Sequence, residues 1–147
     1  MTRSRVTCCV CLLSLAGVPA GIAAGPKIVV PPNLQLSIGG TRMSVGAPSF
    51  LWKGHIVDSA GVSEMRDPPL LRVCTGKTAL LQMPKGAQEV TISEVVERRL
   101  TGHVVIGTRD RRAIRWTPVL RHGTASVEVF VNTKPGFVGY AFTLSRP

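Results

Sequence analysis

Arginine side chains are concentrated in one part of the sequence, where they could capture an anion. Seven arginines lie between positions 98 and 121, and Asp110 is the only acidic residue in that interval. The guanidinium group is a planar fork of donors that matches phosphate, carboxylate or sulfate. Five of them are candidate anion-binding residues: Arg98, Arg99, Arg109, Arg111 and Arg112. The structural alternative is a solvated basic loop that discourages pairing at a sheet edge.

The histidines give no comparable signal for catalysis or for metal binding. His55, His103 and His122 are well separated and have no carboxylate or thiol at metal-ligand spacing. The chain also lacks a Gly-x-Ser-x-Gly elbow and a glycine-rich phosphate loop. A triad of Ser59, His55 and Asp58 would have to assemble in three dimensions, and nearly every chain of this size offers such a combination. The sequence therefore predicts a protein that is not an enzyme, with no cofactor and no metal site.

A second candidate region for binding is the irregular stretch between Phe50 and Pro69. It is rich in glycine, aspartate and serine, which favour loops, and long ordered loops often carry binding residues. Its candidate interaction residues are Trp52, His55 and Asp58. For Trp52 itself, packing in the core is the expected role, because the residue lies in a strand-like sequence.

The elements that must position these residues are β-strands. Apolar and polar residues alternate in segments such as Leu34–Ile38, and turn residues recur about every eight to twelve positions. This pattern predicts an all-β fold: an immunoglobulin-like antiparallel β-sandwich of about eight to nine short strands, with a small β-barrel as the alternative. Residues 109–112 read as a turn between two strands. Residues 94–100 could form two helical turns, but the surrounding pattern favours a continuing strand and loop.

The first 24 residues have the pattern of a secretory signal peptide. Arg3 and Arg5 precede a short apolar run, and small residues suited to cleavage follow it. The run is too short for a membrane-spanning helix, which needs about 20 apolar residues. Val18 stands where a lipoprotein signal requires a cysteine, so release is favoured over lipid anchoring. We therefore expect residues 25–147 to form one β-sandwich domain that is secreted or extracytoplasmic, with no transmembrane span.

The charge and the cysteines limit the partners and the means of stabilisation. The net charge is +10 at pH 7, which favours association with an anionic cell-envelope polymer; a protein partner is the alternative. Nucleic acid is disfavoured, because only Trp116 lies near the arginines as a stacking aromatic. Three of the four cysteines fall in the leader, so Cys74 has no partner for an internal disulfide. It ends an apolar stretch, and a buried, inert thiol is expected there.

Several short segments resemble a group of secreted and lipoprotein immunoglobulin-like sandwich domains of Gram-positive bacteria. The matching segments are Pro32–Gly39, Phe50–Trp52, Val57–Ala60, Pro68–Leu71 and Gly139–Leu144. In that group a cysteine pair flanks the segment from the tryptophan to the aspartate, whereas this chain has Leu51 and Ile56 near those places. The resemblance implies a β-sandwich without the disulfide, and it implies no activity.

Overall fold

β-Strands form all the regular secondary structure of the residues that the computed structural model describes, which are 28–58, 67–108, 112–121, 123–134 and 136–147. These strands are β1 (Leu34–Ile38), β2 (Thr41–Val45), β3 (Ser49–Trp52), β4 (His55–Val57), β5 (Leu70–Arg72), β6 (Ala79–Gln82), β7 (Ala87–Val96), β8 (Arg99–Gly107), β9 (Ala113–Trp116), β10 (Thr124–Thr133) and β11 (Gly136–Ser145). The all-β prediction is therefore confirmed, with eleven strands in place of eight to nine.

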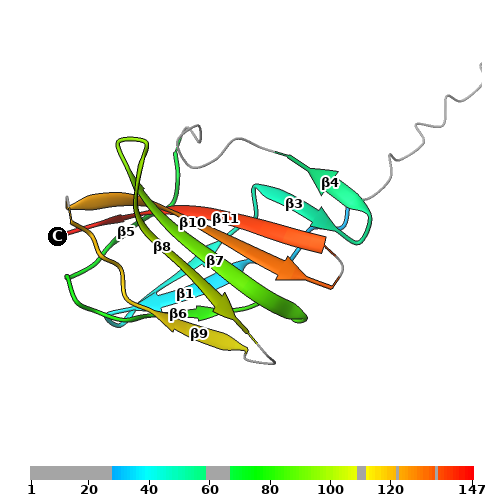
Figure 1. Cartoon of the computed structure of the whole chain (residues 1–147), viewed down its shortest axis with the longest axis horizontal. Helices are drawn as coiled ribbons and strands as arrows, with labels where there is room; N and C mark the ends of the chain where they lie inside the picture. The colour runs from blue at the N-terminus through cyan, green and yellow to red at the C-terminus, as the bar shows by residue number, and fades with distance from the viewer. Residues whose placement is uncertain (1–27, 59–66, 109–111, 122, 135) are drawn as a thin grey trace, which may run out of the picture.

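The strands form two sheets that pack face to face (Figure 1). The small sheet has the order β2-β1-β6-β9, and the large sheet has the order β4-β3-β11-β10-β7-β8. The short strand β5 pairs in parallel with the end of β11, and the other pairs among the described strands are antiparallel. Both sheets end in edge strands, so the sandwich prediction is confirmed and the closed barrel is wrong.

The core lies between the two sheets and follows from the alternation of the strands. In β1 the apolar side chains of Leu34, Leu36 and Ile38 are buried, and Gln35 between them is exposed. The large sheet contributes its own inward row, in which Tyr140, Phe142 and Leu144 of β11 are almost fully buried. Burial of such side chains stabilises the fold by about 1.5–3 kcal/mol each. No helix among the described residues is long and apolar enough to cross a membrane.

Two stretches that were irregular or ambiguous in the sequence are hairpins. The stretch that begins at Phe50 opens with the β3–β4 hairpin, in which Trp52 pairs with His55 across a two-residue turn. Residues 94–100 hold the end of β7, a two-residue turn and the start of β8, with Val96 paired with Arg99. The strand that we favoured there is thus confirmed and the helix is wrong. A continuous ladder with the neighbouring strand decides this against the local helical pattern.

The side chain of Cys74 faces solvent, so the prediction of a buried thiol is wrong. Leu71 and Val73 take the inward positions at the end of β5, and alternation then turns Cys74 outward. The leader, residues 1–24, lies outside the described residues.

Candidate functional site

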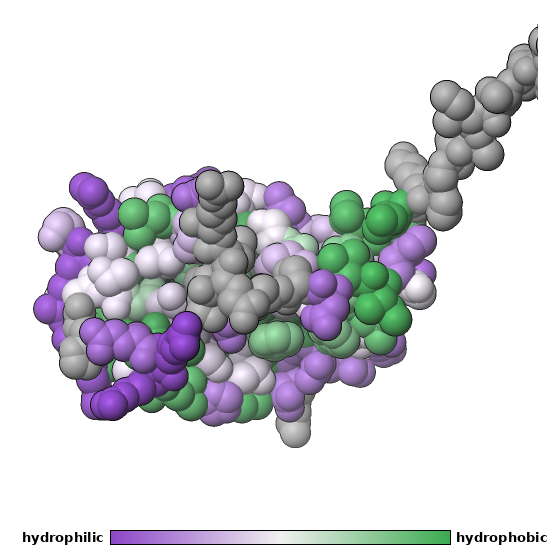
Figure 2. Space-filling view, turned by 90° about the horizontal axis from the view of Figure 1, so that it is seen from above, coloured by the Kyte–Doolittle hydropathy of each residue, from purple (hydrophilic) through white to green (hydrophobic). Residues whose placement is uncertain are grey.

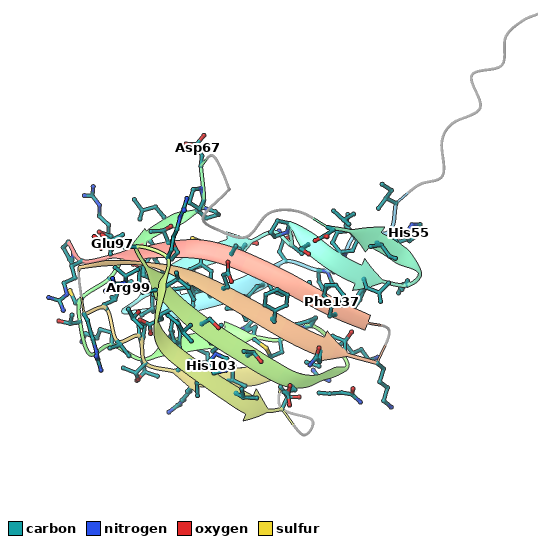
Figure 3. The ribbon with its side chains drawn as sticks, turned by 45° about the horizontal axis from the view of Figure 1, so that its top comes forward. His55, Asp67, Glu97, Arg99, His103 and Phe137 are labelled. Atoms are coloured by element: carbon teal, nitrogen blue, oxygen red, sulfur yellow. The ribbon has the colours of Figure 1, made fainter. Side chains whose placement is uncertain are left out.

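Arg98 and Arg99 lie at the tip of the β7–β8 hairpin, at one end of the sandwich. The turn consists of Glu97 and Arg98, and Arg99 is the first residue of β8. All three side chains are exposed. Figure 3 shows Glu97 and Arg99 at this end and His55 at the far end of the molecule. The hairpin therefore presents two adjacent guanidinium groups to solvent.

The backbone of this turn has two non-glycine residues in the left-handed region, whereas the β3–β4 turn has one, Lys53 (φ 47°), and the β1–β2 turn has none. Glu97 and Arg98 have φ values of 48° and 64°, so both lie in the left-handed region. Such turns usually contain glycine or asparagine, because other residues pay a steric penalty of about 1–2 kcal/mol there. The corresponding turns are Gly39-Gly40 and Lys53-Gly54. Strain of this kind is typical of functional positions, so the charged turn is the first mark of a candidate site.

Two further arginines reach the same end from distant parts of the sequence. Arg72 ends β5 and pairs with Ser145, which in turn pairs with Thr124 at the start of β10. Arg121 lies three residues before that strand. The side chains of both arginines are exposed. At about 4.8 Å per strand, the row from β8 to β5 is roughly 20 Å wide.

We call these four residues, Arg72, Arg98, Arg99 and Arg121, the arginine end. Figure 2 shows hydrophilic residues gathered at this end of the molecule. Within the described part of the chain, none of the four makes an ion pair with a carboxylate. All four are exposed, so their guanidinium groups face solvent, where an anion can reach them, with the exposed Glu97 carboxylate beside Arg98.

A buried carboxylate fixes the loop that carries Arg121. Glu94 of β7 is only 2% exposed. Its two carboxylate oxygens accept hydrogen bonds from the backbone N–H groups of Val119 (2.8 Å) and Leu120 (3.2 Å). These bonds hold Leu120 in a left-handed conformation, with φ at 43°. Charged hydrogen bonds of this type are stronger than neutral ones, so Glu94 positions the loop against the β7–β8 hairpin.

The C-terminus holds the other side of the same loop. The guanidinium group of Arg146 donates to the carbonyl oxygen of Leu120 at 2.7 Å, and its backbone N–H donates to Gly123 at 2.6 Å. Because Arg146 bonds to the loop in this way, its role at the arginine end is to position Arg121.

The structure separates the predicted arginine cluster into two parts. Arg112 is exposed and directly precedes β9, beyond the far end of β8. Because β8 has nine residues, Arg99 and Arg112 lie at opposite ends of a strand roughly 30 Å long. Arg109 and Arg111 lie outside the described residues. The sequence thus identified the hairpin pair, but Arg112 does not join it in the folded chain.

The three candidate residues of the 50–69 stretch are located at the other end of the sandwich. Trp52 is 8% exposed and belongs to the core cluster, as its strand-like sequence predicted. His55 is half-buried in β4, and Asp58 is exposed directly after it. Nearby, Ile56 and Val30 are 73% and 68% exposed, and Figure 2 shows hydrophobic residues at this end. The surface here is apolar rather than charged.

The described residues offer no assembled catalytic group. His55 and His103 lie in β4 and β8, the two opposite edges of the large sheet, and His122 lies outside the described residues. His103 contacts a hydroxyl, with its Nδ1 3.2 Å from Ser93 Oγ. No cluster of three or more histidine, cysteine, aspartate or glutamate side chains that could hold a metal is found among the described residues.

A hollow of about 200 Å³ lies on the outer face of the small sheet. Its lining residues are Gln35, Leu36, Ser37, Arg42, Leu80 and Gln82. Ser37 supplies a hydroxyl, but no carboxylate, imidazole or thiol is among the lining residues to activate it as a nucleophile.

Sequence reasoning missed Arg72 and Glu94. Arg72 lies 26 positions before Arg98, and only the parallel pairing of β5 with β11 brings it to the same end. The sequence does contain one indication that Glu94 is buried. Its position continues the period of two set by Val90 and Ile92, which face the core.

Comparison of the chain with known protein families, with curated proteins and with solved structures found no match.

Proposed function

We propose that the chain is an exported, non-enzymatic module that binds an anionic polymer of the cell envelope at its arginine end. The proposal of export comes from the leader pattern of residues 1–24. The observation that supports binding is the charged turn: Arg98 occupies a left-handed position that is Gly40 in the β1–β2 turn and Gly54 in the β3–β4 turn, the two other two-residue turns described in full. Selection for fold alone would favour glycine or asparagine there. A charged residue at a strained position supports a role in contacting a ligand.

The arrangement of the four arginines supports a repeating anion rather than a single small one. They come from β5, the β7–β8 hairpin and the loop before β10, and they form a row along one end. A row roughly 20 Å wide matches several successive charged units of an extended polymer. Each guanidinium group can donate two parallel hydrogen bonds to a phosphate or a carboxylate. Binding of this kind is expected to weaken steeply as the salt concentration rises.

The test compares two double variants with the same net charge. Arg98→Gln/Arg99→Gln removes two charges from the arginine end, and the control Arg112→Gln/Arg115→Gln removes two exposed charges from elsewhere. The purified proteins are passed over immobilised poly(glycerol phosphate) and eluted with NaCl. We expect the first variant to bind at least about tenfold more weakly than wild type and the control to remain within about twofold. Equal losses in the two variants would show that net charge alone governs retention and would refute the site.

A second candidate function is a protein–protein interaction module acting through the region of residues 50–69. The exposed apolar side chains of Ile56 and Val30 support this candidate, because apolar patches often mark protein contacts. Ile56→Lys separates the two functions: it should abolish capture of a protein partner and leave retention on the anionic polymer unchanged.

A further inference from the structure

The strand β8 forms one edge of the large sheet. In the described part of the chain, β7 alone pairs with β8, and the sheet order ends there. β8 is nine residues long, whereas the opposite edge strand, β4, has three. A free edge presents a row of unpaired N–H and C=O groups that can accept another strand.

The hydrogen-bond register identifies which backbone groups face outward. Thr108 donates its N–H to the carbonyl oxygen of Gln88 at 2.9 Å, which makes these two residues a hydrogen-bonded pair. Such pairs alternate along an antiparallel ladder, so Val104 and Ile106 also bond inward to β7. The N–H and C=O groups of His103, Val105 and Gly107 therefore point away from the sheet.

The side chains of β8 do not protect this edge in the usual way. Natural proteins blunt edges with short strands, prolines, bulges or charged residues. The segment from Leu100 to Ile106 contains no proline and no acidic or basic side chain other than His103, and Leu100 and Val105 are 60% and 53% exposed. The bulge at Glu94 and Val95 lies at one end of the strand and leaves residues 102–107 in regular register.

The charges at the two ends of β8 indicate what kind of strand fits it. Arg98 and Arg99 lie at its beginning, and Arg112 follows its end. A segment added along β8 would thus have guanidinium groups at both of its ends and apolar side chains along its centre. A second copy of this chain fits poorly, because each copy carries a net charge of +10.

We infer that the free edge of β8 binds an extended peptide segment of a partner protein, one with an apolar centre and acidic residues at both ends. The peptide adds as a strand to the large sheet and bonds to the outward backbone groups of His103, Val105 and Gly107. This is the mode of peptide recognition by strand addition, in which backbone bonds give affinity and flanking charges give selectivity. This inference does not depend on the polymer binding proposed above.

The probe is a fluorescent peptide of about nine residues, with a core of alternating valine and threonine and two glutamates at each end. Binding to the full chain is followed by fluorescence anisotropy, and the amide signals of His103, Val105 and Gly107 are followed by NMR. Val105→Pro removes one outward donor without removing a bond to β7, and Val105→Lys adds a charge at the edge. Leu70→Lys is the matched control, because Leu70 is a similarly exposed aliphatic residue, 55% exposed, on β5.

We expect Val105→Pro and Val105→Lys each to weaken peptide binding at least about tenfold and Leu70→Lys to leave it within about twofold. Hydrogen exchange at the three outward amides should slow when the peptide is bound. If Val105→Pro proves unfolded by circular dichroism, the comparison of Val105→Lys with Leu70→Lys decides the matter. Equal binding by all variants, or equal binding of a peptide with lysines in place of the glutamates, would overturn the inference. A concentration-dependent dimer lost in Val105→Lys would instead assign the edge to a second copy.

Discussion

The two ends of the sandwich use the same kinds of element and differ in what these elements present. One end carries the β7–β8 hairpin with Glu97 and Arg98 in its turn, and the other carries the β3–β4 hairpin with Lys53 and Gly54. Both turns have two residues in left-handed conformations. The first has no glycine and joins a row of arginines, whereas the second has the usual glycine and adjoins exposed apolar side chains.

Buried polar side chains also hold segments on both sides of the sandwich. At the arginine end, the Glu94 carboxylate holds the loop at Val119 and Leu120. The Tyr140 hydroxyl donates a 2.8 Å hydrogen bond to the carbonyl oxygen of Pro32, which fixes the segment that enters β1. The difference teaches that a buried carboxylate and a turn with two non-glycine left-handed residues occur together at the arginine end. Both cost stability, whereas the turn of the other end has one such residue, Lys53, followed by glycine.

The largest expected effect is that of Glu94→Ala. The substitution removes the carboxylate acceptor from one buried N–H group, that of Leu120, and one partly buried N–H group, that of Val119, and we expect the free energy of unfolding to fall by about 3 kcal/mol. Urea unfolding measures this change. Glu89→Ala on the same strand is the control. The Glu89 carboxylate is exposed and accepts a 3.2 Å hydrogen bond from the side-chain amide of Asn132. That control should cost less than about 1 kcal/mol. Similar losses in the two variants would show that Glu94 does not anchor the arginine end.

A smaller effect is expected from Tyr140→Phe. The variant keeps the ring in the core but loses the hydrogen bond to Pro32, which should lower the free energy of unfolding by about 1 kcal/mol. Burial raises the pKa of the Tyr140 phenol above its ordinary value near 10. Above about pH 10 the Tyr140 phenol therefore ionises in the unfolded chain but stays neutral in the folded chain. The free energy of unfolding of the wild type should fall as the pH rises through this range, whereas that of Tyr140→Phe lacks this decrease. Denaturation midpoints between pH 8 and pH 11 test this, and a gap between the two proteins that stays constant with pH would contradict it.

Local sequence pattern was enough to predict the fold class. Alternation in Leu34–Ile38 identified the inward face correctly, because a half-buried strand imposes a period of two on the sequence. Apolar composition alone failed for Cys74: exposure alternates unbroken from Leu71 to Cys74, so the thiol takes an outward position although it ends an apolar stretch. How far past Arg72 the alternation continues depends on pairing with Ser145, to which Val73 donates a backbone hydrogen bond, and a local pattern does not contain that partner.

The candidate site was predictable only in the part formed by neighbours in sequence. Arg98 and Arg99 are adjacent in the chain, so their proximity needs no fold. Arg72 joins them through a parallel pairing with β11, and Arg112 leaves them because a nine-residue strand intervenes. Both outcomes depend on sheet order, which is set by long-range contacts rather than by spacing.

Substitutions in the two turns are expected to change stability by amounts similar to that of Tyr140→Phe, and they test most directly why the two ends differ. Glu97→Asn/Arg98→Gly supplies the residues that a left-handed two-residue turn favours, so the free energy of unfolding should rise by about 1 kcal/mol. Gly54→Arg places a side chain at φ 81° and should lower it by about 1 kcal/mol or more.

Retention on the anionic polymer should move in the opposite direction to stability at the arginine end. Glu97→Asn/Arg98→Gly removes one acidic and one basic group, so it leaves the net charge unchanged; it should be more stable and yet elute at lower salt than wild type, because the paired hydrogen bonds of the Arg98 guanidinium group are gone. Gly54→Arg adds a charge at the far end and should not raise retention, because that charge lies away from the row of arginines. If the stabilised variant binds as tightly as wild type, the strained turn has no part in binding, and the two ends differ in sequence without differing in function.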